Sequence, residues 1–253
     1  MHLIDSHCHL DFTLFDLDRD QILTHCEQLG VNDIIVPAVA QKSWRQLLNI
    51  CEQSERLHPA LGMHPMFMEQ HKSEDINALQ EALKRHSVIA IGEIGLDFYL
   101  DKHDKQAQID LFTQQLDIAQ HFKLPVLLHV RKAHDQVIAC LKKHPVVGGI
   151  VHAFNGSFQQ AESYQKLGFL FGVGGAISHP NATRLHTLMA KLPLSHLVLE
   201  TDAPDMPLAG MNGARNSPEN IPKILTSLAE LRNESIEEIA AVTSQNCQTL
   251  LSI

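Results

Sequence analysis

Short apolar runs separated by segments of helical period recur along the whole chain, and this alternation most constrains the fold. Most of the runs are near-continuous in Val, Ile, Leu and Ala, as in parallel strands buried on both faces. Eight such runs lie at residues 2–5, 33–39, 59–63, 88–95, 125–130, 149–154, 169–175 and 197–204. Segments with helical period include 19–30, 43–57, 74–86, 105–122, 158–168, 217–232 and 235–253. Strand and helix in alternation predict an α/β fold with parallel strands.

The length of the chain favours a closed barrel over an open sheet. Eight repeats within 253 residues fit a single domain, residues 1–253, folded as a TIM (β/α)8 barrel with an extra C-terminal helix. An open, doubly wound sheet is the structural alternative, but it normally carries a Gly-rich phosphate loop after its first strand. Here the first strand runs into DSHCHLD (5–11) instead.

Composition narrows the class of partner and the compartment. The formal net charge is −9 with neutral histidines, so the chain has no overall field for holding nucleic acid along a broad basic surface. No apolar run approaches the ~20 residues that span a bilayer, and the N-terminus lacks the pattern of a secretory signal. The five cysteines are scattered and odd in number, which predicts reduced thiols and a cytoplasmic protein. Nothing in the sequence indicates a protein partner.

Ligand-type side chains stand at the carboxyl ends of six predicted strands. They are His7 and His9 after the first run, His64 after the third, Glu93 in the fourth, His129 and Arg131 at the fifth, His152 in the sixth and Asp202 in the eighth. Each alone would be read as a satisfied core or surface residue. A barrel brings all of them to one rim, where barrel enzymes place their chemistry, so their joint placement predicts a metal site.

The donor types indicate which metals such a site would hold. Four imidazoles and two carboxylates are enough for two divalent ions, while Cys8 should face away from its flanking histidines and pack. We expect Zn²⁺, Mn²⁺, Co²⁺, Ni²⁺ or Mg²⁺, of which the first four suit a nitrogen-rich shell better. Two neighbouring ions can share a water molecule, lower its pKa and clamp a phosphate group.

The motifs at these positions resemble those of the TatD family of metal-dependent hydrolases. As they stand here, they are DSHCHLD, ALGMHP, IGEIGLDFY, LPVLLHVR, VHAFNG, LETDAP and the late RNSP, spread over essentially the whole chain. The resemblance implies a TIM barrel and metal-dependent hydrolysis, associated with phosphodiester cleavage in DNA by a DNase or 3′–5′ exonuclease.

The resemblance also implies roles for the ligand-type residues. One metal would be held by His7, His9 and Asp202, and a second by His129 and His152. Glu93 would bridge the two, and Asp202 would also act as general base toward the bridging water. Glu93 and Asp202 are therefore the predicted catalytic residues.

Contacts with the substrate are less defined by the sequence. His64 and Arg131 are the candidates for binding a phosphate group, with a salt bridge at the rim as the alternative for Arg131. We expect Asp97 to orient a ligand imidazole or to pin its loop. Arg215 and Asn216 either reach the site or belong to a structural turn.

Three functions are compatible with these features. The first is a two-metal phosphodiesterase acting on DNA ends or single-stranded DNA, and the second hydrolyses a small non-nucleic substrate such as an amide, lactone or phosphoester. The third is a metal-binding barrel that serves as a partner module without turnover. Substrate choice should depend on the loops at 12–20, 62–73, 96–105 and 203–217.

Overall fold

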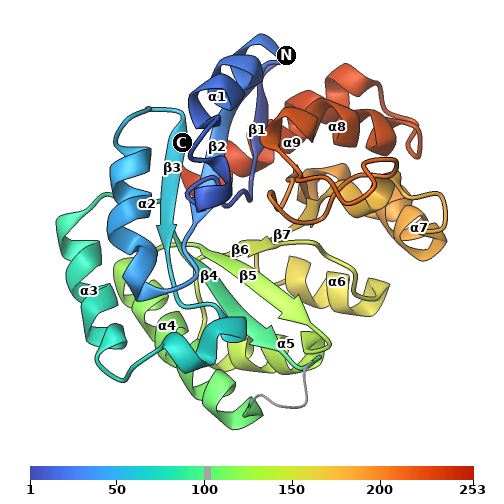
Figure 1. The fold of residues 1–253 in the computed structure, drawn as a ribbon. Coiled ribbons are helices and arrows are strands. Elements are labelled where there is room, and N and C mark those ends of the chain that lie inside the picture. Colours follow the sequence, from blue (N-terminus) through green and yellow to red (C-terminus); the bar gives the residue numbers. More distant parts are fainter. Residues whose placement is uncertain (100–103) are drawn as a thin grey trace.

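The computed structural model describes residues 1–99 and 104–253, so part of the 96–105 loop lies outside the described residues. Within them, eight parallel strands are hydrogen-bonded in sequence order and curve into a barrel (Figure 1). The strands are β1 (Leu3–Asp5), β2 (Val31–Pro37), β3 (Leu57–Leu61), β4 (Ala90–Asp97), β5 (Val126–Arg131), β6 (Gly149–Val151), β7 (Phe169–Val173) and β8 (Leu197–Leu199). The predicted barrel is confirmed, because a doubly wound sheet would not pair its strands in sequence order.

The barrel closes between its first and last strands through bonds made just beyond β1 and β8. The Ser6 N–H donates to the Leu199 carbonyl at 2.9 Å, and the Asp202 N–H donates to the His7 carbonyl at 2.8 Å. We call this join the β1–β8 seam. Because His7, His9 and Asp202 all lie on the seam, closing the barrel brings three predicted ligands together.

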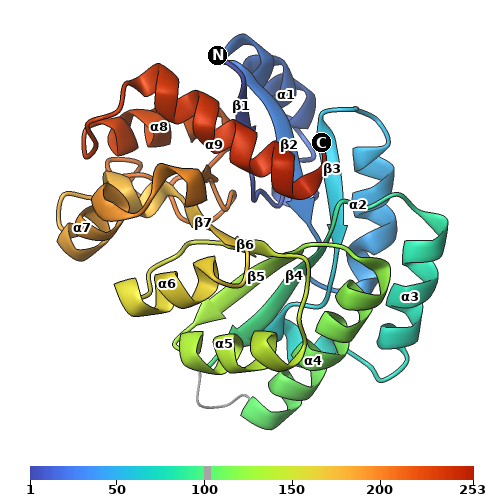
Figure 2. The same ribbon diagram turned by 180° about the vertical axis from the view of Figure 1, so that it is seen from behind.

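Helices connect successive strands and cover the outside of the barrel (Figures 1 and 2). The connecting helices are α1 (Arg19–Gln28), α2 (Trp44–Cys51), α3 (Asp75–Arg85), α4 (Lys105–Phe122), α5 (His134–Lys143), α6 (Phe158–Gln165) and α7 (Thr183–Lys191), and α8 (Ile221–Ala229) follows β8. Short 3-10 helices lie at η1 (Thr13–Phe15), η2 (Gln41–Ser43), η3 (Pro65–Gln70), η4 (Gly175–Ser178), η5 (Leu194–His196) and η6 (Pro218–Asn220).

An additional helix, α9 (Ile236–Leu251), follows α8 and crosses the amino-terminal end of the barrel (Figure 2). Its Cys247 and Leu251 pack against a buried cluster to which seven strands give one residue each, as expected of an interior barrel layer. The strand residues are Ile4, Ile35, Ala60, Ala90, Leu127, Ile150 and Val198. The predicted extra C-terminal helix is thus confirmed. Because it covers the amino-terminal end, the opposite rim is the open one.

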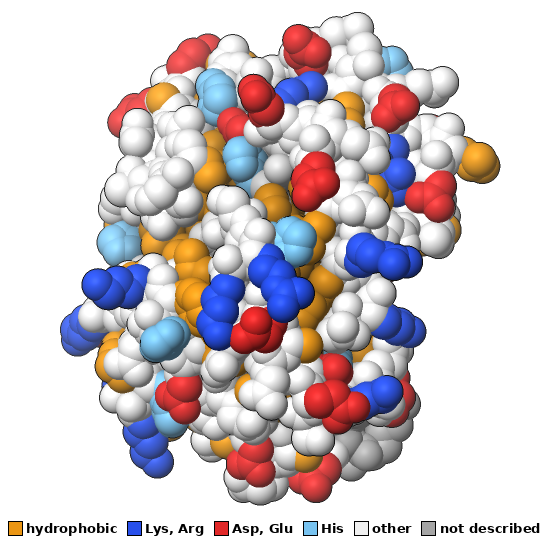
Figure 3. Space-filling view, turned by 90° about the vertical axis from the view of Figure 1, so that its left-hand side faces the viewer, with side chains coloured by type: hydrophobic (Ala, Val, Ile, Leu, Met, Phe, Trp, Pro, Cys, Tyr) orange, Lys and Arg blue, Asp and Glu red, His pale blue; other side chains and the backbone are white. Residues whose placement is uncertain are grey.

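The surface over α2 and α3 carries charges of both signs (Figure 3). Lys and Arg side chains are interspersed there with Asp and Glu, and they do not gather into one broad basic patch on this face. This mixture agrees with the net charge of −9. In the part of the chain that the structure describes, no helix is long and apolar enough to cross a membrane.

Candidate metal centre

Glu93 of β4 lies in the middle of a buried group of imidazoles at the carboxyl-terminal end of the barrel. Its Oε2 atom is 3.2 Å from His7 Nε2 and 3.4 Å from His9 Nε2. The same two nitrogens are each 3.7 Å from Asp202 Oδ1. These side chains form the first ligand group.

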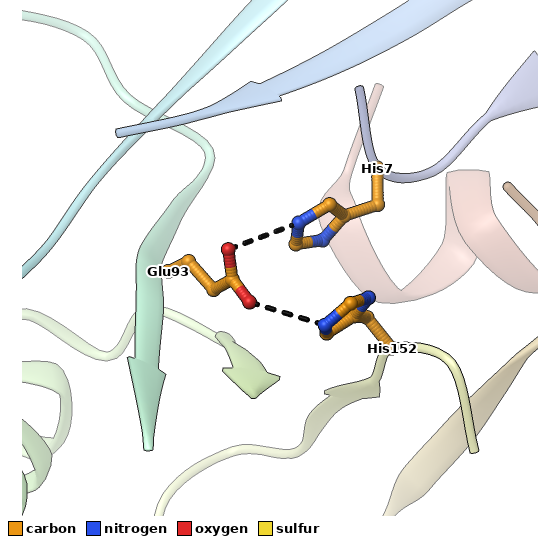
Figure 4. A group of neighbouring side chains, drawn as sticks. All are labelled: His7, Glu93 and His152. Atoms are coloured by element: carbon orange, nitrogen blue, oxygen red, sulfur yellow. Dashed lines mark hydrogen bonds and ion pairs between the residues drawn. The ribbon is translucent and has the colours of Figure 1, made fainter. Parts of the chain in front are cut away.

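The other oxygen of Glu93 faces a second ligand group. Its Oε1 atom is 3.2 Å from His64 Nε2, 3.3 Å from His129 Nδ1 and 3.2 Å from His152 Nε2. Figure 4 shows the carboxylate of Glu93 with His7 opposite one oxygen and His152 opposite the other. One carboxylate, only 2% exposed, therefore lies between two groups of imidazoles.

Five strands supply the six predicted ligands, and the barrel brings all six together. They are His7 and His9 after β1, Glu93 in β4, His129 in β5, His152 after β6 and Asp202 after β8. The first strand ends at Asp5, as expected, and the chain beyond it continues to a bridge between Cys8 and Ala203. Cys8 is buried in the hydrophobic core, as predicted.

Neighbouring polar groups fix the orientation of the imidazoles. Asp97 Oδ2 lies 3.0 Å from His129 Nε2, which leaves Nδ1 to face the central carboxylate. Asp97 Oδ1 accepts a hydrogen bond from the Tyr99 N–H at 2.9 Å, so Asp97 both orients a ligand imidazole and pins its loop. The Pro37 carbonyl lies 3.1 Å from His9 Nδ1 and directs the opposite ring nitrogen to the centre.

Asp5 stabilises the β1–β8 seam through hydrogen bonds to both sides of it, a role that we did not predict from the sequence. Its fully buried carboxylate accepts hydrogen bonds from the Thr201 N–H at 2.9 Å, the Thr201 hydroxyl at 2.6 Å and the His7 N–H at 3.2 Å. Burial raises the pKa of Asp5 to about 7, although these hydrogen bonds lower it. A signal was available, because a carboxyl group that ends a strand buried on both faces must find hydrogen-bond donors.

Glu200 is a second buried carboxyl group to which the sequence assigned no role. Its Oε1 atom accepts a hydrogen bond from the Ala153 N–H at 2.6 Å and lies 3.7 Å from His152 Nδ1. Its side chain occupies space left by Gly172, where an added Cβ would come within 1.9 Å of Glu200 Oε2. A residue larger than glycine on β7 would therefore displace the carboxyl group that supports His152.

The protonation states around Glu93 depend on one another. Burial acts to raise the pKa of Glu93, but the imidazoles of His64, His7 and His152 hold it well below its ordinary value. Burial lowers the pKa of His64 to about 4. Burial also acts to lower the pKa of His9, but the Glu93 carboxylate outweighs it and raises that pKa to about 9. The ionised Glu93 beside the neutral His64 is a pair that metal ions bind, whereas binding of a metal ion to His9 releases a proton.

The arrangement of donor atoms fits divalent metal ions. Among the described residues, Glu93 Oε1 is buried and makes no hydrogen bond of acceptable geometry, although three imidazole nitrogens face it. Three sets of side chains keep their ligand atoms within 4.8 Å of one another: His7, Glu93 and His152; His7, His9 and Asp202; and His64, Glu93 and His129. Nitrogen and carboxylate oxygen donors in such sets suit first-row transition ions.

Three non-glycine residues beside the predicted site have left-handed backbone conformations. Lys132 follows β5 with φ 53°, Ala153 follows β6 with φ 45°, and Asp202 follows β8 with φ 56°. Such conformations are uncommon for side chains with a Cβ and cluster at functional sites. Their concentration on this rim agrees with a site placed there.

Arg131 lies outside both ligand groups. It is the last residue of β5, and its guanidinium carbon stands 3.7 Å from the centroid of the Tyr99 ring. Within residues 1–99 and 104–253 it forms no salt bridge, so the alternative of a rim salt bridge is not what the structure has. By contrast, the second predicted substrate contact, His64, lies inside the second ligand group.

The two late residues of uncertain role are structural. Arg215 forms a salt bridge with Asp18 at 2.5 Å and donates to the Leu14 carbonyl, which ties the 203–217 loop to the loop after β1. Asn216 is fully buried and donates to the Thr201 carbonyl at 2.9 Å. Among the described residues, neither side chain is hydrogen-bonded or ion-paired to a predicted metal ligand.

A barrel of eight strands with buried histidines and carboxylates at its carboxyl-terminal rim defines the class of metal-dependent hydrolases. Comparison with known families identifies the branch: the model of the TatD related DNases matches residues 4–252, and the chain belongs to this family. It is 43% identical over 253 residues to the uncharacterized metal-dependent hydrolase YjjV of Escherichia coli (strain K12), an alignment that covers 99% of this chain and 98% of YjjV.

Two further comparisons bear on the fold and the activity. The crystal structure of YjjV, a TatD homolog, matches the present structure with a TM-score of 0.96 over 99% of this chain and 98% of that one. The 3′-5′ ssDNA/RNA exonuclease TatD of Erwinia tasmaniensis is 30% identical over 263 residues, covering 99% of this chain and 100% of the relative.

Proposed function

We propose that this chain is a two-metal phosphodiesterase that removes nucleotides from the 3′ ends of single-stranded DNA. One observation carries the proposal: Glu93 has imidazole nitrogens opposite both of its oxygens, at 3.2–3.4 Å, which divides the donors into two groups that share one carboxylate. The Erwinia relative is a 3′-5′ ssDNA/RNA exonuclease, which supports the substrate class.

In this proposal each ligand group holds one ion. His7, His9 and Asp202 would hold the first and His129 and His152 the second, and Glu93 would contribute one carboxylate oxygen to each group. His64 joins the second group rather than the substrate, because its Nε2 is as near Glu93 as the other ligands are. The expected ions are Zn²⁺, Mn²⁺, Co²⁺, Ni²⁺ or Mg²⁺. When bound, they lower the pKa of a water molecule and offset the charge of the phosphate group.

Side chains of the protein carry out the proton transfer and bind the phosphate. Asp202, with its side chain 15% exposed, is the carboxylate of the first group that solvent reaches, and it accepts the proton of the attacking water molecule. The water oxygen bonds to phosphorus as the bond to the leaving 3′ oxygen breaks, and the proton passes to that oxygen. Arg131, which lies outside both ligand groups, donates to a phosphate group of the strand.

A rival function is hydrolysis of a small amide, lactone or phosphoester by the same residues. The net charge of −9 favours it, because this charge repels long nucleic acid strands.

For the organisation of the chain we propose that residues 1–253 act as one domain. We also propose the cytoplasm as the compartment, on the basis of the scattered cysteines.

The test is hydrolysis of a single-stranded oligonucleotide labelled at its 5′ end. The protein is stripped of metal with a chelator and then supplied with each candidate ion in turn. We expect a ladder of shortened 5′-labelled products with at least one ion, and no ladder for the chelated protein or for Glu93→Gln. Turnover of small esters without any shortening of DNA would refute the nuclease and leave the rival.

A further inference from the structure

Two cationic side chains lie over one exposed aromatic ring beside the candidate metal centre. The guanidinium carbon of Arg131 lies 3.7 Å from the centroid of the Tyr99 ring, and Lys132 Nζ lies 5.0 Å from it. Tyr99 is 48% exposed, and both cations are exposed as well. We call these three residues the rim cluster.

The backbone fixes the rim cluster to the metal centre. Arg131 is two residues beyond His129 on β5, so both side chains leave the same face of the strand, about 7 Å apart along it. Arg131 is paired in register with Asp97, whose carboxylate holds both the His129 ring and the Tyr99 N–H. The cluster therefore stands directly outward from a predicted metal ligand.

Among residues 1–99 and 104–253, the N–H groups of Arg131 make no hydrogen bond or salt bridge. Another arginine, Arg215, also lies over a ring, with its guanidinium carbon 4.4 Å from the Phe15 centroid, but it donates to Asp18 and to a carbonyl group. In the described ranges, Arg131 and Lys132 form no salt bridge. A guanidinium held by an aromatic face keeps its N–H edge available, and that edge matches the oxygens of a phosphate group.

The positive charge of the rim cluster can attract a phosphate group, which the net negative charge of the whole molecule cannot. The chain as a whole carries −9, so attraction of a polyanion has to come from a few cations near the centre. Lys132 has a left-handed backbone, φ 53°, at the point where its side chain joins that of Arg131 on the ring. Two cations at one place bind a phosphate group better than either alone.

Resting on the nuclease function above, we propose that Arg131 and Lys132 form a subsite for the phosphate that neighbours the scissile one in a nucleic acid strand. Tyr99 is the positioning residue of this subsite, because its ring holds the guanidinium in place. The subsite lets the enzyme select a strand of linked nucleotides over an isolated phosphodiester, which has no second phosphate to offer.

The experiment compares two substrates with the full-length, metal-loaded protein. One is a labelled single-stranded oligonucleotide, and the other is bis(p-nitrophenyl) phosphate, which has one phosphate group. Arg131→Ala and Tyr99→Leu should each lower the ratio of kcat/KM for the oligonucleotide to kcat/KM for the small ester by about tenfold, mainly through KM. Tyr99→Phe keeps the ring face and should restore the ratio.

Two further readouts separate this role from a merely structural one. The slope of log kcat/KM against log salt for the oligonucleotide should fall by about one in Arg131→Ala. Arg45→Ala removes the same charge from the exposed surface of α2 and should leave the ratio and the slope unchanged. Thermal unfolding of each variant verifies that it is folded.

The outcomes are distinct for the two proposals. If the wild-type protein cleaves the oligonucleotide and Arg131→Ala and Tyr99→Leu behave like Arg45→Ala, the subsite is refuted and the nuclease stands. If the wild-type protein cleaves the small ester but no DNA with any ion, the nuclease is refuted and the subsite falls with it. Selective loss with recovery in Tyr99→Phe supports the subsite.

Discussion

Replacing Asp5 by alanine should open the β1–β8 seam and destabilise the barrel. Asp5 accepts three hydrogen bonds, two of them from the backbone N–H groups of Thr201 and His7. Alanine leaves both N–H groups buried without their partner, at about 1–3 kcal/mol each, so the free energy of unfolding should fall by about 2–6 kcal/mol. Asp5→Asn keeps one acceptor oxygen and should lose less than half of that.

The neighbouring residue provides a matched control. Ser6 is also fully buried, but among the described residues its hydroxyl has no hydrogen-bond partner. Ser6→Ala removes an unsatisfied polar group of small volume and should therefore be neutral or slightly stabilising. The two substitutions stand side by side on the seam and differ in the hydrogen bonds that they remove.

The assay is urea unfolding followed by circular dichroism, on metal-free protein so that metal binding adds nothing to stability. We expect the order wild type and Ser6→Ala, then Asp5→Asn, then Asp5→Ala. The reasoning is refuted if Asp5→Ala unfolds at the same urea concentration as Ser6→Ala, since the carboxyl group would then not hold the seam.

Three further predictions concern the site, the pH dependence and the thiols. Asp97→Asn should weaken metal binding by about 10–100-fold, seen as a higher metal concentration for half-maximal activity; an unchanged requirement would contradict the role of Asp97 in orienting His129. The hydrogen bond and charge of Arg215 hold the pKa of Asp18 below its ordinary value of 3.8, so the pair stabilises the fold above that pH and loses its effect as the pH falls through the lower, folded value. The difference in Tm between wild type and Asp18→Asn should therefore shrink on acidification. A difference that stays constant would refute the stabilisation by the ionised pair. Burial raises the pKa of Cys26 and Cys51 to about 12, so Ellman's reagent should react slowly with native protein and with all five free thiols after unfolding; fast labelling of the native state would show that the thiols are accessible.

The barrel could be predicted from the sequence because its strands are buried on both faces. Runs such as 88–95 have no polar alternation, and β4 is indeed buried at every position. Strand ends were less predictable. The first run extends to Asp5 as expected, but β8 ends at Leu199, well before residue 204, because the chain leaves the sheet where Asp202 turns into the site.

The convergence of the predicted ligands followed from topology alone. Residues at the carboxyl ends of parallel strands must meet at one rim, so His7 and Asp202 could be placed together although they are far apart in sequence. The protonation and orientation of each imidazole could not be predicted, because they depend on partners such as Asp97 and Pro37 that only the folded chain brings into contact.

The placement of His64 and of the rim cluster shows where sequence reasoning ends. His64 follows its strand as the other ligands do, and only the 3.2 Å separation from Glu93 Oε1 assigns it to the second ligand group. The contact joins Arg131, at the end of β5, to Tyr99, two residues beyond β4, and no spacing in the sequence encodes the position of one side chain over another's ring.

The measurement that tests the central claim most directly is the metal content of the purified, dialysed protein by inductively coupled plasma mass spectrometry. Two ligand groups that share Glu93 predict about two divalent ions per chain in the wild type. They also predict that Glu93→Gln loses metal ions from both ligand groups and that Arg45→Ala keeps the metal content of the wild type. A wild-type content that stays near one ion per chain at saturating metal, or a Glu93→Gln content equal to wild type, would contradict a centre built on one shared carboxylate.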